Sequence, residues 1–266
     1  MAKTKKKKTT RKKSKRKFKW DKKARLALAG AVAVLLVLLA VFIAVKSHQP
    51  SHPAYEFDKE TAYGIDVSSH NGKIDWKTVK DEVDFAFIRV GYRGHANGSV
   101  NLDKKAKYNL KHANKNGIPV GVYFYSQAVN DEEAEEEAAF LLDAIKEYEV
   151  SLPVVIDFEY AYSKNTITGR LYEAKLTKAE KTSLINAFCK RVKQAGYTPG
   201  VYASTYIYES HINPKALDKD TVIWVADYNE SITFDGEYDI WQSSEKGSCK
   251  GVSSKYVDTD YWYIKE

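Results

Sequence analysis

Two carboxylates close an apolar run that begins at Pro153 and reads Pro-Val-Val-Ile-Asp-Phe-Glu-Tyr. If this run is a β-strand, its side chains alternate between two faces, so Asp157 and Glu159 project from the same face with Cα atoms about 6.5 to 7 Å apart. Like charges held this close allow one carboxyl to stay protonated as a proton donor while its neighbour is ionised. A lone Asp-x-Glu is more often a strand end whose acids meet water. The pair indicates acid catalysis only if other groups accompany it.

Other acids and aromatic residues lie at the ends of further apolar runs. Asp66 and Asp227 follow two such runs, and Asp258 lies within the last one. Each acid alone is more often a cap or a surface residue, and most of the rings serve a core, but together they suggest a cleft that binds sugars, because rings with a polar tip stack on sugar faces. The aromatic candidates for substrate binding are Tyr92, Tyr125, Tyr160, Tyr228 and Trp241, to which the acid Asp227 is added. This combination of acids and rings predicts glycan hydrolysis.

Short apolar strands alternate with helical stretches over most of the chain, which is typical of βαβ units. Eight strands are predicted, at 62–67, 85–92, 119–126, 153–159, 200–203, 222–227, 239–243 and 256–261. Helical spacing covers 75–83, 103–116, 131–149 and 177–195. The strand count predicts an α/β fold, an irregular TIM-like (β/α) barrel with few helices in its last part, and an open doubly wound sheet is the alternative. In a barrel the candidate side chains would gather where the strands end.

The first 25 residues differ from the rest of the chain in charge. They hold fifteen of the 42 Lys and Arg and one of the 35 Asp and Glu, Asp21, which leaves 27 basic and 34 acidic residues afterwards. Residues 26–45 carry no charge, and such a run is long enough to cross a membrane. We expect a transmembrane helix at 26–45 rather than a cleaved signal peptide, because no convincing cleavage site follows it.

The charge pattern then predicts orientation and location. A basic cytoplasmic tail at 1–25 follows the positive-inside rule and places the later residues outside a single-pass cell membrane protein. The tail could contact anionic lipid. Nucleic-acid binding by this tail is the rival interpretation, and we expect none.

The remaining chain divides into a stalk and one domain. Residues 46–61 contain Pro50 and Pro53 and show no periodicity, whereas 62–266 suffice for a single domain with a sizeable core. Its excess of acids favours a neutral or mixed-charge polymer as substrate. Two cysteines, Cys189 and Cys249, do not indicate a disulfide framework, and no metal site or phosphate loop is visible. We therefore expect no cofactor.

Several motifs of this domain resemble those of the glycoside hydrolase family 25 lysozymes, N-acetylmuramidases of bacteria and their phages. The resemblance runs from about Tyr63 to Tyr263. It rests on Gly-Ile-Asp-Val-Ser-Ser-His-Asn-Gly at 64–72 with Ile-Asp-Trp at 74–76, Phe-Ile-Arg-Val-Gly-Tyr at 87–92, Gly-Val-Tyr-Phe-Tyr at 121–125, Val-Ile-Asp-Phe-Glu at 155–159, Trp-Gln-Ser-Ser at 241–244 and Val-Asp at 257–258. It implies an irregular barrel and cleavage of the β-1,4 bond between N-acetylmuramic acid and N-acetylglucosamine in peptidoglycan glycan strands.

The resemblance also implies roles for the acids. Glu159 would be the general acid, and Asp157 would either attack the anomeric carbon or orient the 2-acetamido group that attacks instead. Asp66 and Asp258 match further acids of the family's cleft. The sequence departs from the family at Ser243, where a Tyr is common, and in the long polar stretch 163–176. Two other possibilities remain: a catalytically inactive peptidoglycan-binding surface module, and a scaffold in which the N-terminal tail matters most.

Overall fold

A computed structural model describes residues 22–47 and 55–264 of the chain. The chain divides into two compact units, residues 1–49 and 50–266, which we describe separately. Most of the predicted basic tail and residues 48–54 of the predicted stalk lie outside the described residues. Residues 55–60 form no helix or strand.

The first unit contains the helix α1 (Lys22–Ser47). A helix is therefore present where one was expected, but the prediction that it spans a membrane is wrong: no helix in the described part of the chain is both long and apolar enough to do so. Side chains 38–45 of the predicted span lie outside the described ones.

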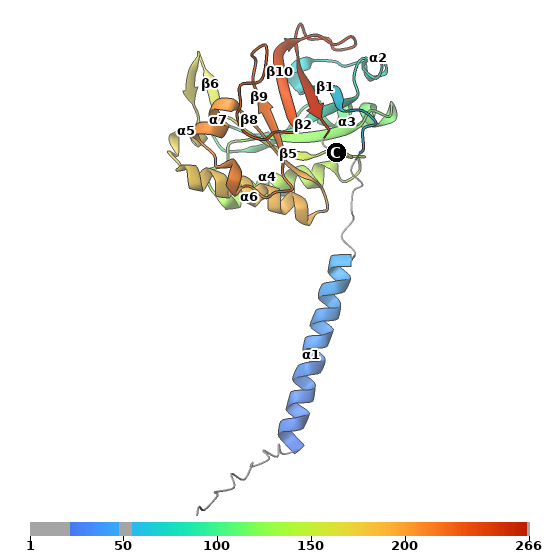
Figure 1. Cartoon of the computed structure of the whole chain (residues 1–266), viewed down its shortest axis with the longest axis vertical. Coiled ribbons are helices and arrows are strands. Elements are labelled where there is room, and N and C mark those ends of the chain that lie inside the picture. Colours follow the sequence, from blue (N-terminus) through green and yellow to red (C-terminus); the bar gives the residue numbers. More distant parts are fainter. Residues whose placement is uncertain (1–21, 48–54, 265–266) are drawn as a thin grey trace, which may run out of the picture. The chain divides into compact units, whose positions relative to one another are not determined.

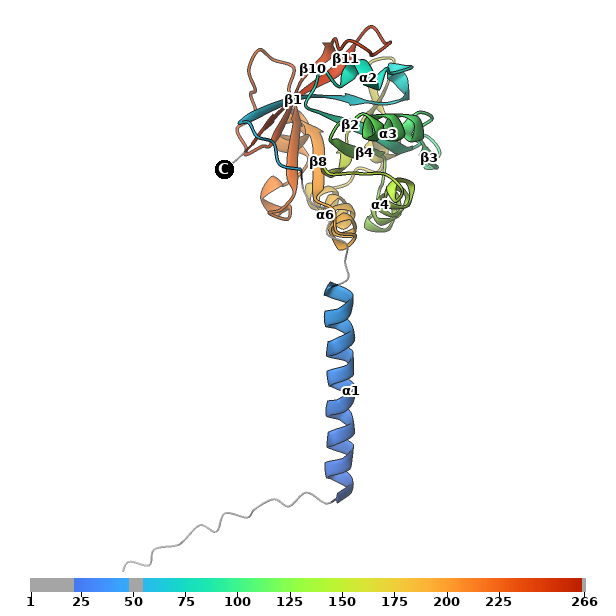
Figure 2. The same ribbon diagram turned by 90° about the vertical axis from the view of Figure 1, so that its right-hand side faces the viewer.

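The second unit is an eight-stranded barrel (Figures 1 and 2). Its strands are β1 (Thr61–Val67), β2 (Phe85–Arg93), β4 (Val120–Ser126), β5 (Val154–Phe158), β8 (Pro199–Ser204), β9 (Val222–Ala226), β10 (Ile240–Gly247) and β11 (Val257–Tyr263). Neighbours pair in parallel from β1 through β10, β11 runs antiparallel between β10 and β1, and the β1–β2 pairing closes the ring. The barrel therefore follows the strand prediction, with one reversed strand.

Three short strands lie outside the barrel ring. The strand β3 (Val100–Leu102) extends the sheet beyond β2, and β6 (Ala161–Ser163) pairs with β7 (Thr166–Thr168) as a separate hairpin. The β6–β7 hairpin follows the strand that carries Asp157 and occupies the polar stretch that departs from the family pattern. Its turn places Lys164 and Asn165 at positive φ, which Asn tolerates better than most residues.

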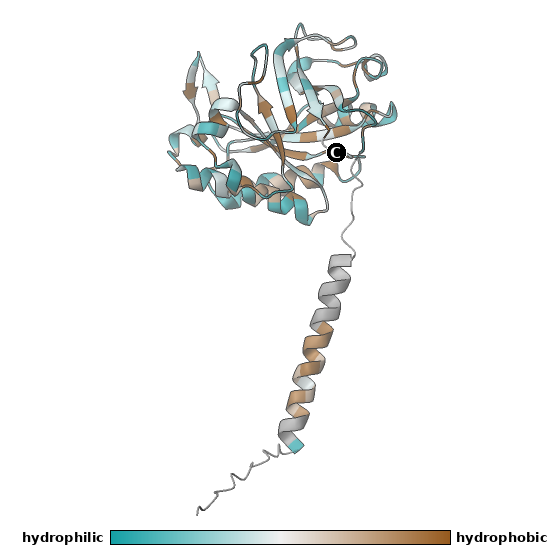
Figure 3. Ribbon diagram, in the orientation of Figure 1, coloured by the Kyte–Doolittle hydropathy of each residue, from teal (hydrophilic) through white to brown (hydrophobic). Residues whose placement is uncertain are grey.

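Helices cover the first part of the barrel and become scarce towards its end. They are α2 (Trp76–Val79), α3 (Ala106–Lys115), α4 (Asp131–Ile145), α5 (Arg170–Glu173), α6 (Lys178–Gln194) and α7 (Thr205–Ser210), with the 3₁₀ turns η1 (Ser69–Asn71) and η2 (Pro214–Ala216). Figure 2 shows α3, α4 and α6 outside the strands, and hydrophilic residues dominate the visible sides of α4 and α6 in Figure 3. No described helix follows η2, so the last three strands have no helical cover of their own.

The two long outer helices begin where the sequence provides side-chain caps. The Asn130 side chain accepts a hydrogen bond from the Glu133 amide at the start of α4. At the start of α6, Thr177 and Glu180 form a reciprocal capping box. Both caps satisfy amides that lack a partner in the first turn of a helix. The apolar sides of these helices then bury against the barrel wall.

Aromatic rings fill the barrel interior below its mouth. Phe85 and Phe87 are fully buried, and their rings occupy space left by glycines on neighbouring strands. A Cβ on Gly64 would lie 2.4 Å from the Phe85 ring, and one on Gly121 would lie 2.2 Å from the Phe87 ring. The Trp224 ring stacks at 4.5 Å from Phe87. Strand side chains alternate between two faces, so every second residue of a strand points into the barrel. The inward residues that follow these buried rings along each strand therefore form the mouth of the barrel.

Truncating one ring of this interior tests how far the barrel depends on it. Phe87→Ala would remove a fully buried ring and leave a cavity, so we expect a loss of about 3 to 5 kcal/mol in the free energy of unfolding. Urea denaturation of the full-length chain measures it. Tyr256→Ala, at a ring 44% exposed, is the control and should change stability by about 0.5 kcal/mol or less. A loss below about 1 kcal/mol for Phe87→Ala would contradict this packing.

Candidate active site

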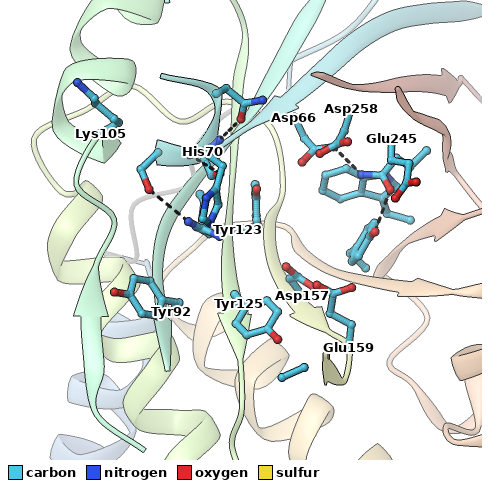
Figure 4. Close-up of a pocket in the computed structure, with 18 of the residues that line it drawn as sticks. Asp66, His70, Tyr92, Lys105, Tyr123, Tyr125, Asp157, Glu159, Glu245 and Asp258 are labelled. Carbon is cyan, nitrogen blue, oxygen red and sulfur yellow. Dashed lines mark hydrogen bonds between the residues drawn. The ribbon is translucent and has the colours of Figure 1, made fainter. Parts of the chain in front are cut away.

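A cavity of about 1010 Å³ opens at the ends of the parallel strands (Figure 4). It is the place where a barrel of this type gathers functional side chains. Seven of the residues predicted from the sequence line it: Asp66, Tyr92, Tyr125, Asp157, Glu159, Tyr228 and Asp258. They come from six different strands or strand ends, so the closed barrel is what brings them together.

The Asp157 and Glu159 side chains lie side by side in the cavity, as Figure 4 shows. Asp157 is within β5, where it pairs in register with Tyr125 of β4 and Tyr202 of β8. Glu159 follows the last residue of that strand. The Asp157 carboxyl is 6% exposed, and its Oδ1 atom has no hydrogen-bond partner among the described residues. A buried acceptor without a partner is costly in a folded protein, so this oxygen is available to a ligand.

A second pair of carboxyls faces the first across the cavity. Asp66 of β1 and Asp258 of β11 are direct cross-strand partners, and Figure 4 shows their carboxyl groups next to each other. Burial raises the pKa of Asp66 well above its usual range, and the charge of Asp258 adds to this. Burial and then the charge of Glu245 raise the pKa of Asp258 to about 6.

Gln242 of β10 holds this second pair in place. Its Nε2 atom donates to Asp66 Oδ2 at 2.6 Å, and its Oε1 atom accepts hydrogen bonds from Tyr202 at 2.9 Å and Tyr228 at 2.6 Å. The two hydroxyls fix which end of the amide faces Asp66. The hydrogen bonds from Gln242 and Tyr123 oppose the rise in the pKa of Asp66 but do not cancel it.

The acid and base assignments depend on the charges around Glu159. Burial and then the charge of Asp258 raise the pKa of Glu159, the Arg89 guanidinium opposes both, and the resulting pKa is about 7. Burial also raises the pKa of Asp157 well above its usual range, with the charges of Glu159 and Asp66 adding to it. A carboxyl with a pKa near 7 is suited to donate a proton at neutral pH.

Arg89 supplies a positive charge that acts on the acids of this site, and Asp103 holds it. The Arg89 Nε atom lies 3.0 Å from Asp103 Oδ2, and a second guanidinium nitrogen lies 2.9 Å from it. Burial acts to raise the pKa of Asp103, but the amides of Lys105 and Ser69 and the Arg89 charge outweigh it and lower the pKa. The pair therefore keeps one positive charge fixed beside a group of acids.

A polar network outside the barrel positions the Glu159 backbone. Glu159 lies beyond the strand ladder, and its carbonyl accepts a hydrogen bond of 3.0 Å from Gln127 Nε2. Arg170 donates to the Gln127 carbonyl and forms a two-pronged ion pair with Glu133 of α4. This network connects the segment after the β6–β7 hairpin to α4 and to the backbone of the catalytic candidate.

Three residues predicted for substrate binding are not among those that line this cavity. Tyr160 is buried, and its ring packs against Tyr172 and His211. Asp227 is buried and accepts hydrogen bonds from Thr205 and Thr233, so it holds a loop. Trp241 donates its Nε1 hydrogen to the Asp227 carbonyl. Trp241 alternates with the inward residue Gln242 and therefore lies on the opposite face of β10. Tyr160 lies beyond the end of β5, and its ring points away from the cavity into the contacts named above.

Arg89, Gln242 and Asp260 are among the polar residues of the site that the prediction missed, and strand alternation could have found these three. Arg89 follows Phe87 by two positions, Asp260 follows Asp258 by two, and Gln242 follows Ile240 by two. Asp260 is fully buried below the cavity, where it accepts a hydrogen bond of 2.9 Å from Trp224 Nε1. Burial and then the charge of Asp66 raise its pKa well above the usual range. Among the described residues, no group of three or more His, Cys, Asp or Glu is arranged to hold a metal ion.

The fold and the site together define a barrel of the glycoside hydrolase type, with paired carboxyls at the mouth of a sugar-sized cleft. The family model of Glycosyl hydrolases family 25 matches residues 65–252. The chain therefore belongs to glycosyl hydrolase family 25. The match begins within β1, contains β2 to β10 and ends before β11, so Asp258 lies outside it.

Individual relatives agree with this family. The modular autolysin LytC of Streptococcus pneumoniae, solved with a synthetic peptidoglycan ligand, is 30% identical with a TM-score of 0.65, over 78% of this chain and 48% of LytC. A family 25 glycosyl hydrolase of Bacillus anthracis is 25% identical with a TM-score of 0.62, over 82% of this chain and 95% of that one. The uncharacterized protein YegX of Escherichia coli K12 is 27% identical over 203 residues, 73% of this chain and 66% of YegX. The chain thus spans about half of LytC and slightly under two thirds of YegX.

The electrostatic coupling across the cavity can be tested directly. Because the Asp258 charge raises the pKa of Glu159, Asp258→Asn should lower that pKa below about 7. Carboxyl-carbon NMR titration of the full-length chain measures it, and Glu159→Gln identifies the resonance. Glu230→Gln, an exposed acid that does not line the cavity, is the control and should leave the titration unchanged. An unchanged titration in Asp258→Asn would contradict the coupling.

Proposed function

We propose that this protein is an N-acetylmuramidase that hydrolyses the β-1,4 bond between N-acetylmuramic acid and N-acetylglucosamine in peptidoglycan. The observation that carries the proposal is the side-by-side placement of Asp157 and Glu159 in a cavity where both pKa values are raised. Membership of glycosyl hydrolase family 25 supports the reaction class. The peptidoglycan ligand solved with LytC supports the choice of polymer.

Glu159 acts as the general acid in this proposal. It donates its proton to the glycosidic oxygen as the bond to the anomeric carbon breaks, so the leaving sugar departs with a neutral hydroxyl. Its pKa of about 7 keeps the carboxyl largely protonated below neutral pH. In the second half of the reaction the same carboxylate accepts a proton from the attacking water.

Asp157 acts through the 2-acetamido group of the substrate. Its unpartnered Oδ1 atom accepts the N–H hydrogen of that group, which turns the acetamido oxygen towards the anomeric carbon. The oxygen then forms the new bond to that carbon while the glycosidic bond breaks, and water later opens the resulting ring. Direct attack by Asp157 is the alternative, but a carboxyl so deeply buried is better suited to hold a donor than to approach a sugar carbon.

The cavity wall supplies surfaces for sugar rings. Tyr92 and Tyr125 are partly buried and line the cavity, as does the half-exposed ring of Tyr228. Such rings stack on the apolar faces of sugars, and their hydroxyls bind those of the substrate. Since peptidoglycan lies outside the cytoplasm, we place the action of this domain at the cell surface.

Removal of the proposed acid gives the decisive test. Glu159→Gln in the full-length chain should lower the release of soluble fragments from purified peptidoglycan by about 10² to 10⁴-fold, because an amide cannot donate the proton. Mass analysis should find N-acetylmuramic acid at the reducing ends of wild-type products. Glu230→Gln is the matched control and should retain activity.

Two other results would overturn parts of the proposal. Fragments with N-acetylglucosamine at the reducing end would show that a different bond is cut. Retention on insoluble peptidoglycan without any release would favour a glycan-binding module that lacks hydrolysis.

The pH dependence of hydrolysis should reflect the same carboxyl. Since Glu159 must be protonated and burial raises its pKa to about 7, the rate should fall as pH rises through about 7. Asp258→Asn should move this falling limb to lower pH, because it removes a charge that raises the pKa. Initial rates between about pH 4 and pH 9 measure the effect, and an unmoved limb would argue against Glu159 as the group that titrates.

A further inference from the structure

The two ends of the cavity carry opposite charge. The acids Asp66, Asp157, Glu159, Asp258 and Glu245 line this cavity together with the two lysines Lys104 and Lys105. Figure 4 shows Lys105 and His70 on the side of the cavity opposite Asp258 and Glu245. After residue 25 the chain has 34 acidic and 27 basic residues, so a cationic wall here runs against the overall charge.

A buried carboxylate, that of Asp103, connects the three elements that form the cationic wall around Lys104 and Lys105. Asp103 is 1% exposed and accepts hydrogen bonds from the Ser69 amide at 3.1 Å, the Lys105 amide at 2.8 Å and Arg89 Nε at 3.0 Å. It therefore ties β2 and the η1 turn to the start of α3. Lys104 and Lys105 follow Asp103 directly, so their backbone positions are fixed by this anchor.

The two lysines are not neutralised by the protein. Arg89 is paired with Asp103, but within the described ranges 22–47 and 55–264 neither Lys104 nor Lys105 forms an ion pair. Lys104 is exposed, and Lys105 is partly buried. Two ammonium groups without a counter-charge at one end of a binding cavity are available to an anion, and a wall of this sign focuses anions towards it.

We propose that Lys104 and Lys105 bind the carboxylates of the peptides attached to the glycan strand and so make the protein selective for peptide-bearing peptidoglycan. This inference rests on the proposed muramidase function. It adds the peptide part of the substrate to the sugars that the acids and aromatic rings bind. The glycan backbone of a peptide-bearing strand needs no cations, because its sugar rings and acetamido groups are neutral and each substituted lactyl carboxyl is an amide. The peptides carry the carboxylates, and the carboxyls that remain ionised at the acidic end of the cavity repel them. Opposed charges at the two ends thus orient a strand whose peptide side is anionic.

The test compares two forms of one substrate with identical sugars. Peptidoglycan freed of teichoic acid is used either with its peptide carboxylates intact or after their conversion to methylamides. The full-length wild-type chain should cleave the intact form with a kcat/KM about three- to tenfold higher, the range expected for one or two exposed charge contacts. Lys104→Ala/Lys105→Ala should lose this preference by slowing only on the intact form.

Two controls separate charge from structure. Lys107→Ala, an exposed lysine that does not line the cavity, should keep the wild-type preference, and Lys104→Arg/Lys105→Arg should restore it. High salt should reduce the wild-type preference, because the screening length falls from about 30 Å at 0.01 M to about 3 Å at 1 M. Equal losses on both forms, or an unchanged preference in the alanine variant, would overturn the proposal. So would a lysine effect seen only when teichoic acid is present, since that would assign the site to phosphate.

The experiments distinguish failure of the muramidase proposal from failure of the charge proposal. If the wild-type chain releases no fragments from either form, the muramidase proposal fails. The charge proposal is then tested by binding, with Glu159→Gln mixed with insoluble intact or methylamidated peptidoglycan. The charge proposal is supported if Glu159→Gln is retained more tightly on the intact form and if this difference disappears once Lys104→Ala/Lys105→Ala is added. Equal retention on the two forms would refute it.

Discussion

The rest of this structure depends on holding several carboxyls of like charge in one barrel mouth. Asp66 and Asp157 are each at most 6% exposed, Glu159 and Asp258 lie beside them, and Asp260 is fully buried below. Burial and mutual repulsion both favour the neutral form, so the group cannot be fully ionised near neutral pH. Because the carboxyls are packed together, at least one of them stays protonated and can donate a proton. Glu159 is the carboxyl placed to donate it to the substrate.

The barrel offsets the cost of this arrangement in two ways. Its lower interior is dry and aromatic, with Phe87 and Trp224 in contact, so the acids rest on a rigid support. Its upper interior provides the few polar partners that buried acids require: Gln242 for Asp66, Trp224 for Asp260, and the Arg89 charge near Asp157. The strand β11, paired between β10 and β1, brings Gln242 to Asp66 across 176 positions of the chain.

Much of the barrel could be predicted from sequence because its signals are local. Short apolar runs that alternate with helical stretches predicted all eight barrel strands to within a few residues. The missing elements are those with weak local signals, such as the three-residue strands β6 and β7 in a polar stretch. The transmembrane prediction relied on a charge-free run alone, and the structure does not support it. For the site, acids at strand ends were informative, but Tyr160 and Trp241 show that proximity in sequence does not decide which face a side chain occupies.

The loops at the barrel mouth tolerate sequence change that the strands do not. The strands fix the carboxyls, and a shift of even one residue in register would turn Asp157 away from the cavity. The loops can vary without this penalty, because they are anchored at single points, Asp103 for the start of α3 and Arg170 for the segment after the β6–β7 hairpin. Both anchors are tied to the site itself, one through Arg89 and the other through Gln127 and the Glu159 carbonyl. Changes in these loops can therefore alter which part of a polymer is bound while the bond-cleaving groups stay in place.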